Sequence, residues 1–203
     1  MSTFNEVQTR INADYLNRAF GAETQRAIRA AIRHYERRRW SFNETATALT
    51  TSAGQAFVAL PANFLLLDDL RITISNEALP LSKREPQQIR DMNISNQRSE
   101  PTDYALYQNR IELAMTPDSA YSLPVYYIKS LPTLSADSDT NAWITGGMED
   151  VVAYHAAKLM WATVLRNDKE AAKFAVLEQT ALSNMTSYHE QLRTPGKIKH
   201  TNF

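Results

Sequence analysis

The chain has no cysteine among its 203 residues, which excludes disulfides, thiol catalysis and thiolate metal sites. Its five glycines form neither a phosphate-cradling loop nor the Gly-x-Ser-x-Gly turn that carries a nucleophilic serine. None of the four histidines stands in the His-Glu-x-x-His spacing of a zinc hydrolase. The commonest catalytic motifs are therefore missing. We predict that the protein is not an enzyme and has no catalytic, metal or cofactor site.

One histidine and two acidic pairs are the remaining candidates for chemistry. His155 lies on an apolar helical stripe, which favours a core or interface histidine with a satisfied hydrogen bond over a ligand or general base. Asp68 and Asp69 are neighbours on a predicted strand, so their side chains point to opposite faces. Asp137 and Asp139 are spaced as in a calcium loop but lack its glycine and distal glutamate, which favours a solvated turn. A hydrolase, which needs a carboxylate of raised pKa in a cleft, is the least favoured alternative.

Long hydrophobic runs are also absent. The longest covers only residues 64–67, whereas a helix needs about 20 apolar residues to cross a bilayer. Residues 1–6 lack the basic start and apolar stretch of a signal peptide. We therefore expect no membrane partner and a protein that stays soluble in a cytosol-like compartment.

The formal charge cancels to zero, but the charges are unevenly distributed. Residues 1–40 hold eight basic and four acidic side chains, residues 41–150 hold seven and fourteen, and residues 193–203 add three basic ones. A neutral total does not favour nucleic acid as the partner. Basic ends and an acidic middle can instead complement one another in head-to-tail or ring assembly, and they steer docking.

Hydrophobic periodicity indicates helices at both ends of the chain and strands in the middle. Helical spacing predicts helices over residues 4–18, 22–39, 145–165 and 167–192. A period of two predicts hairpins over 45–60, turning at 52–54, and over 103–115, turning at Gln108-Asn109. Further strands are expected at 66–75 and 121–129, with Pro124 favouring an edge or a bulge, and a short helix is expected to begin at Pro86.

The fold class that follows is α+β. Four helices from the two ends pack most simply into a four-helix bundle, with an inserted antiparallel β-rich subdomain and an extended C-terminal tail. The expected divisions are N-terminal bundle helices at 1–40, the β-rich insertion at 41–140, C-terminal bundle helices at 141–192 and the tail at 193–203.

Four arginines form a stripe on the second predicted helix. Arg26, Arg29, Arg33 and Arg37 are spaced by three, four and four residues. Three interpretations stay open: a solvated face, a face that meets acidic surface on a partner through arginine–carboxylate pairs, and a sequence-independent DNA-binding module. The neutral total and the acidic middle favour contact with a neighbouring subunit or another protein.

An aromatic corner follows this helix. Trp40 and Phe42 lie where the helical period gives way to the strand period. We interpret the pair as a hydrophobic joint between bundle and sheet.

Several motifs occur in a recognisable order. They are Ala30-Ala31-Ile32-Arg33-His34-Tyr35, Arg39-Trp40-Ser41-Phe42-Asn43-Glu44, Thr50-Thr51-x-x-Gly54-Gln55-x-Phe57-x-x-Leu60-Pro61-x-x-Phe64, Pro101-x-x-Tyr104-Ala105-Leu106, Asn109-Arg110-Ile111-Glu112-Leu113 and Ser135-x-Asp137-x-Asp139-Thr140-Asn141-x-Trp143. In order and spacing they resemble the head-to-tail adaptor proteins of tailed bacteriophages, also called head-completion or tail-tubular A proteins. The resemblance covers about residues 25–180.

The resemblance implies a structural subunit of the virion, made in the host cytoplasm, that forms a homo-oligomeric ring, in such families a dodecamer. The ring sits at the head–tail junction between the portal protein and the tail nozzle, and DNA passes through it without sequence-specific contact. The helical bundle would pack between neighbours and the β part would face the nozzle. The tail would dock on the portal, with Arg193, Lys197, Ile198, Lys199 and Phe203 as its contacts. The short-tailed group is favoured, a long-tailed relative stays open, and the role of residues 93–99 stays open.

Overall fold

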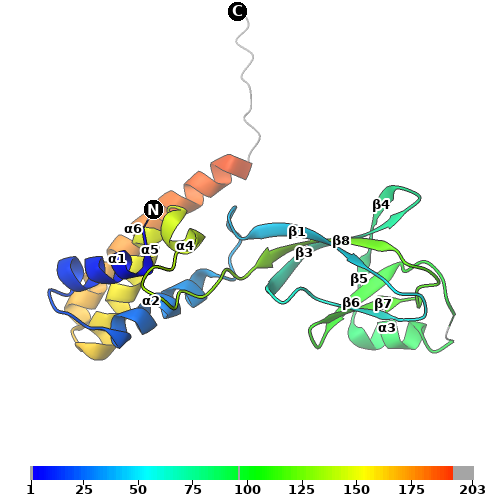
Figure 1. Cartoon of the computed structure of the whole chain (residues 1–203), viewed down its shortest axis with the longest axis horizontal. Coiled ribbons are helices and arrows are strands. Elements are labelled where there is room, and N and C mark those ends of the chain that lie inside the picture. Colours follow the sequence, from blue (N-terminus) through cyan, green and yellow to red (C-terminus); the bar gives the residue numbers. More distant parts are fainter. Residues whose placement is uncertain (1, 96, 194–203) are drawn as a thin grey trace, which may run out of the picture. The chain divides into compact units, whose positions relative to one another are not determined.

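A computed structural model describes residues 2–95 and 97–193, apart from the side chains of residues 192 and 193. The chain divides into two compact units (Figure 1). A helical unit is built from the chain up to Phe42 and from Leu131 onward, and a β unit from residues 43–130. The protein is therefore a mixed α+β protein, as the periodicity predicts.

The helical unit contains five described α-helices and two π-helical segments. The π-helical segments η1 and η2 continue α1 and α5 directly. Helix α5 packs against both α2 and α6. The elements are α1 (Phe4–Arg10), η1 (Ile11–Tyr15), α2 (Ala22–Tyr35), α4 (Ala142–Thr145), α5 (Glu149–Leu159), η2 (Met160–Val164) and α6 (Asp168–Arg193).

Helix ends follow local capping chemistry. Helix α1 begins with a capping box, in which Thr3 Oγ1 accepts from the Glu6 amide at 3.2 Å and the Glu6 carboxylate accepts from the Thr3 amide at 2.8 Å. The third predicted helix begins later than expected: Thr145 ends α4, and α5 begins only at Glu149. The physical reason is Gly147, whose φ of +88° interrupts the helix.

The core of the helical unit consists of the apolar stripes that the period indicates. Fully buried side chains come from α1, η1, α2, α4 and α5: Phe4, Val7, Ile11, Ile28, Ala31, Tyr35, Trp143, Ile144, Val151, Val152 and Ala156. Helix α6 adds Phe174, which is 8% exposed. The unit therefore has a hydrophobic core of its own.

The β unit contains two four-stranded sheets among its described residues, ordered β1-β8-β3-β4 and β2-β7-β6-β5. All pairings of the named strands are antiparallel except that of β5 with β6. The strands are β1 (Glu44–Thr50), β2 (Phe57–Ala59), β3 (Phe64–Ile74), β4 (Glu77–Pro80), β5 (Ser82–Lys83), β6 (Asp103–Tyr107), β7 (Arg110–Ala114) and β8 (Ser122–Lys129).

Two predictions about strand pairing are wrong, and one is confirmed. Strands β6 and β7 form the expected hairpin, with Gln108 and Asn109 at positive φ in the turn. The hairpin predicted over residues 45–60 does not form, because β1 pairs with β8 and β2 pairs with β7. Pro124 is not in an edge strand, since β8 lies between β1 and β3, and the register shifts of β8 lie opposite residues 64–69 of β3.

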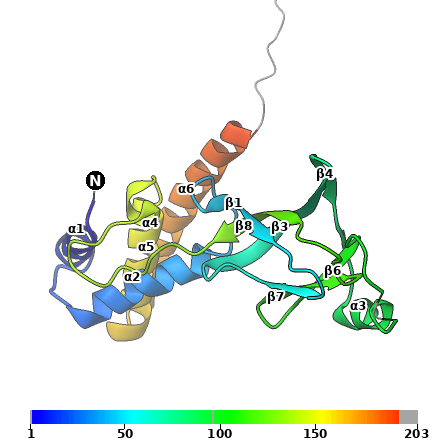
Figure 2. The same cartoon turned by 45° about the vertical axis from the view of Figure 1, so that its right-hand side comes forward.

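The short helix α3 (Pro86–Met92) begins at Pro86, as predicted. It packs on β6 and β7 (Figure 2). Ile89 meets Ala105 and Ala114 there in a small buried cluster. The main core of the β unit is formed by buried side chains of the two sheets: Leu70, Ile72, Leu81, Tyr104, Ile111, Leu113, Leu123, Val125 and Tyr127.

Candidate functional site

The arginine stripe lies on the exposed side of α2. Arg26, Arg29 and Arg33 belong to the helix, whereas Arg37 lies in the turn that follows Tyr35. Arg26, Arg33 and Arg37 are exposed, and no ion pair joins any of them to another residue that the structure describes. These three guanidinium groups are therefore available to a partner.

Arg29 differs from the other three because its position is fixed inside the helical unit. Its Nε donates to the Leu134 carbonyl at 2.8 Å, and its guanidinium lies 5.4 Å from the centre of the Phe4 ring. The loop after Leu131 and helix α1 thus hold this side chain half-buried.

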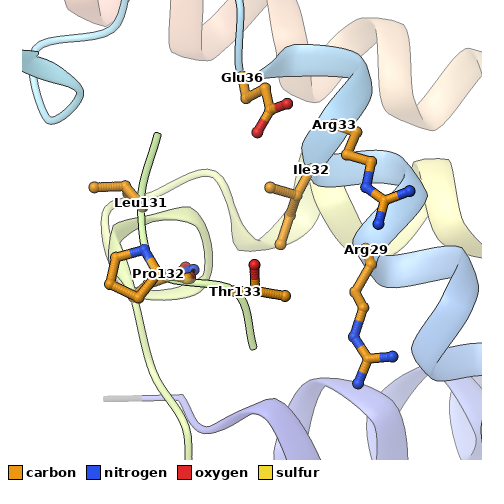
Figure 3. Close-up of a pocket in the computed structure, with 8 residues that line it drawn as sticks. Arg29, Ile32, Arg33, Glu36, Leu131, Pro132 and Thr133 are labelled. Carbon is orange, nitrogen blue, oxygen red and sulfur yellow. Dashed lines mark hydrogen bonds between the residues drawn. The ribbon is translucent and has the colours of Figure 1, made fainter. Parts of the chain in front are cut away.

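A pocket of about 230 Å³ opens beside this part of α2 (Figure 3). One wall is α2, and the other is the loop that carries Pro132. The lining residues are Arg29, Ile32, Arg33, Glu36, Leu131, Pro132, Thr133 and Asn141. The lining contains the Glu36 carboxylate as well as two guanidinium groups, and one of these, Arg29, already binds Leu134 and Phe4, so the pocket favours no ligand of one charge.

A buried polar cluster joins the three longest helices of the unit. The Glu178 carboxylate on α6 accepts a hydrogen bond from the Tyr35 hydroxyl on α2. It also meets His155 Nδ1 at 2.7 Å and Lys158 Nζ at 2.5 Å, both on α5. His34 stacks on His155 with ring centres 4.7 Å apart. The expectation that His155 is a core histidine with a satisfied hydrogen bond is confirmed.

The charge of Glu178 follows from these partners. Burial disfavours ionisation, but the hydrogen bonds from His155, Lys158 and Tyr35 outweigh it and lower the pKa of Glu178 to about 2. An ionised carboxylate only accepts, so His155 carries a proton on Nδ1. Burial, followed by the hydrogen bond to Glu178, raises the pKa of the Tyr35 hydroxyl. A carboxylate held ionised in this way binds helices together and is a poor general acid.

Sequence reasoning missed Glu178, although a signal for it exists. In α6 the inward positions recur as Phe174, Glu178, Ala181 and Met185. A single acid on an otherwise apolar stripe needs a buried partner. His155, at a similar position on α5, is that partner.

The aromatic corner packs within the helical unit. Trp40 is 3% exposed and donates from its indole to the Tyr35 carbonyl at 3.3 Å. The Phe42 ring lies 5.0 Å from that of Trp143 and 6.0 Å from that of His189. Phe42 ends the first segment of this unit, and the next residue begins the β unit.

The acidic pairs have structural partners. Asp69 pairs with Arg71 at 2.7 Å. Asp139 accepts from the backbone amides of Ser135 and Ala136, and these bonds lower its pKa. In the described residues no group of three or more acidic or histidine side chains is arranged to hold a metal ion.

The predicted portal contacts lie at the end of the chain. Lys197, Ile198, Lys199 and Phe203 are outside the described residues, and so is the side chain of Arg193. Among the helices that the structure describes, none combines the length and the apolar character of a membrane span.

A helical unit with exposed arginines that form no ion pair with any described residue, together with a β unit that has its own core, is typical of the class of proteins that bind others through their surfaces. The sequence comparison specifies that class. The chain belongs to the SU10 adaptor protein family, whose match covers residues 2–198. It is therefore a structural adaptor of a bacteriophage, which confirms the resemblance found in the sequence. No curated protein matches the chain.

Proposed function

We propose that the protein forms an oligomeric ring that joins the capsid portal to the tail at the head–tail junction and lets DNA pass. The observation that carries this proposal is the adaptor-family match over nearly the whole chain. The lack of a reactive constellation in the described polar clusters supports a structural role, because their charged groups are engaged in binding helices together. A ring of twelve copies, built on a four-helix bundle, is the expected form.

The arginine face of α2 is the proposed protein contact. Arg33 and Arg37 present exposed guanidinium groups that form no ion pair with any residue the structure describes, and such groups form planar, bidentate pairs with carboxylates. The β unit of a neighbouring copy is one candidate for the acidic partner, because residues 43–130 hold ten acidic and seven basic side chains. The portal protein is the other candidate for the acidic surface.

Residues 193–203 are proposed to dock on the portal, and the β unit is proposed to meet the tail nozzle. Arg193, Lys197 and Lys199 give the tail segment its positive charge, and Ile198 and Phe203 supply apolar anchors. Trp40 and Phe42 are proposed to be the joint between the two units, since they precede the crossing from one unit to the other.

Binding to the portal protein of the same phage tests this function. The full chain should co-sediment with the portal ring, a chain lacking residues 194–203 should lose this binding, and the Arg33→Glu/Arg37→Glu variant should bind at least tenfold more weakly. The Lys169→Glu variant is a matched control, because it reverses an exposed charge elsewhere in the helical unit. Equal binding by the full and shortened chains would contradict the role of the tail.

A DNA-binding role through Arg26, Arg29, Arg33 and Arg37 is the alternative, and salt separates the two. Each phosphate contact releases counterions, so DNA affinity would fall steeply as salt rises. Arg29 is committed to Leu134 and Phe4, which leaves three arginines for phosphate. A flat or undetectable response of DNA affinity to salt would rule out the alternative.

A further inference from the structure

Aromatic rings and guanidinium groups alternate along one face of the β2-β7-β6-β5 sheet. The Arg110 guanidinium lies 4.9 Å from the centre of the Phe57 ring and 5.9 Å from that of the Tyr107 ring. The Arg90 guanidinium lies 4.4 Å from the centre of the same Tyr107 ring. These four side chains come from β7, β2, β6 and α3, and we call them the arginine–aromatic row.

The row lies on the face of this sheet that turns away from the main core of the β unit. Ile111 on β7 is buried in that core, so its neighbours Arg110 and Glu112 point to the opposite face. Helix α3 packs on that face beside β6 and β7 but leaves part of it open. Phe57 is 40% exposed there and Tyr107 is 37% exposed. The row is therefore accessible to a partner.

A single buried carboxylate holds the two arginines. Glu112 Oε1 accepts from Arg110 Nη2 at 2.6 Å and from Arg110 Nε at 3.2 Å, and Glu112 Oε2 lies 3.5 Å from Arg90 Nε. The Glu112 side chain is only 8% exposed. No other carboxylate among the described residues forms an ion pair with either guanidinium. One negative charge thus faces two positive charges, and the row keeps an excess positive charge.

This arrangement suits a second carboxylate. A guanidinium that stacks on a ring uses its face, whereas its N–H groups lie in its plane and stay directed toward ligands beside the ring. The rings and Glu112 already fix both guanidinium groups, so binding costs little additional side-chain entropy. Tyrosine, phenylalanine and arginine are also the residues that gather at the centres of protein interfaces.

Nucleic acid fits the row less well than an acidic protein does. Tight binding to DNA commonly uses about six to ten phosphate contacts, whereas the row offers two guanidinium groups with a carboxylate fixed between them. The β unit as a whole holds seven basic and ten acidic side chains, a net charge of −3. Each ring of the row already has a guanidinium over it, which leaves less of its face for stacking with a base.

We propose that the arginine–aromatic row is the docking site for an acidic segment of the tail nozzle protein. The segment places an aspartate or glutamate against Arg90 and Arg110, and an apolar side chain beside the two exposed rings. The inference rests on the proposed contact between the β unit and the nozzle, and it assigns that contact to named residues and to one kind of chemistry.

Nozzle binding by the complex of the full chain with the portal protein tests this proposal. Arg90→Gln removes one charge while Glu112 keeps its pair with Arg110, so circular dichroism of the variant should be unchanged. The variant should bind the nozzle protein at least tenfold more weakly, because a charged hydrogen bond is lost. Arg71→Gln is the matched control and should bind normally, since it removes an exposed arginine that pairs with Asp69 on the other sheet of the unit.

Photo-cross-linking identifies the occupant directly. In a chain with Phe57→p-benzoylphenylalanine, illumination of the complex in the presence of DNA should attach the chain to a nozzle peptide that contains an aspartate or glutamate. Changing that acid to its amide should weaken binding as much as Arg90→Gln does. The two changes together should add no further loss, because they remove the same pair.

Each result decides the question. Equal nozzle binding by Arg90→Gln and the unmodified chain would overturn the proposal and leave the adaptor function intact. Attachment at position 57 to DNA, or to a peptide without an acid, would overturn it as well. If the unmodified chain binds the portal but not the nozzle, the proposed tail contact of the β unit fails, and this inference fails with it.

Discussion

Removing the charge of Glu178 should destabilise the helical unit in a way that depends on pH. The perturbation is Glu178→Gln, which keeps the size of the side chain but replaces the carboxylate that accepts from Tyr35, His155 and Lys158. In the native protein these hydrogen bonds outweigh burial and lower the pKa of Glu178 from 4.5 to about 2. Because one pKa unit is worth about 1.4 kcal/mol, the ionised carboxylate contributes about 3 kcal/mol of stability.

The sign of the pH dependence follows from the direction of this change. A lowered pKa gives stability that is fully present above the unfolded value near 4.5 and is lost as the pH falls toward 2. The difference in unfolding free energy between the native protein and the variant should therefore fall from about 3 kcal/mol at pH 5 to about 1 kcal/mol at pH 3.

Urea unfolding of both proteins at pH 5, 4 and 3 measures this difference. Glu170→Gln is the matched control on the same helix, since its pair with Lys173 is on the surface and should contribute under about 0.5 kcal/mol. A difference for Glu178→Gln that is the same at pH 5 and pH 3, or below about 1 kcal/mol at pH 5, would refute the reasoning.

Three further substitutions test other contacts of the helical unit. Arg10→Ala, which removes two partly exposed ion pairs, with Glu149 at 3.0 Å and with Asp150 at 2.7 Å, should cost at most about 1 kcal/mol for each pair and less in 1 M salt; a larger loss that salt does not change would contradict this. Trp40→Ala should cost about 3 kcal/mol or more in urea unfolding because the ring is buried; a loss below 1 kcal/mol would show that it is not packed. Gly147→Ala should lower the melting temperature by a few degrees, at a cost of about 1–2 kcal/mol, because φ is +88° and the new Cβ would lie 3.1 Å from Met185; an unchanged melting temperature would count against the strained turn.

Elements set by local signals could be predicted from the sequence. Helix α3 begins at Pro86, and the Gln108-Asn109 turn joins β6 to β7, because proline and turn residues act on their immediate neighbours. The strand expected at residues 66–75 corresponds to β3, which spans Phe64–Ile74. In each case the information lies within a few residues of the element.

Pairings between distant segments could not be predicted in the same way. Strand β1 pairs Glu44 with Ile128, more than eighty residues away, and an alternating threonine-rich segment carries no mark of its partner. The sequence therefore favours β2, the next strand along the chain, as the partner of β1, although β2 belongs to the other sheet. The edge position predicted for Pro124 is wrong for a related reason. Whether a strand is central or at an edge depends on which strands flank it, and β8 lies between β1 and β3.

In the candidate site, too, features set by nearby residues can be predicted from the sequence, and contacts with distant segments cannot. The arginine positions on α2 follow from helical spacing, but the fixing of Arg29 by Leu134 depends on a segment more than a hundred residues later. Glu178 and His155 each stood on an apolar stripe, and only the packing of α6 on α5 brings them together. A polar residue on an apolar stripe indicates that its side chain needs a buried partner, but it does not indicate which residue that partner is.

The mass of the complex between this chain and the portal protein of the same phage tests the adaptor function most directly. Native mass spectrometry of the mixed proteins should show the portal ring carrying a fixed, closed set of copies of this chain, expected to be twelve, with no partly filled series at saturation. A chain that stays monomeric beside an unchanged portal ring at micromolar concentrations would contradict the proposed adaptor ring.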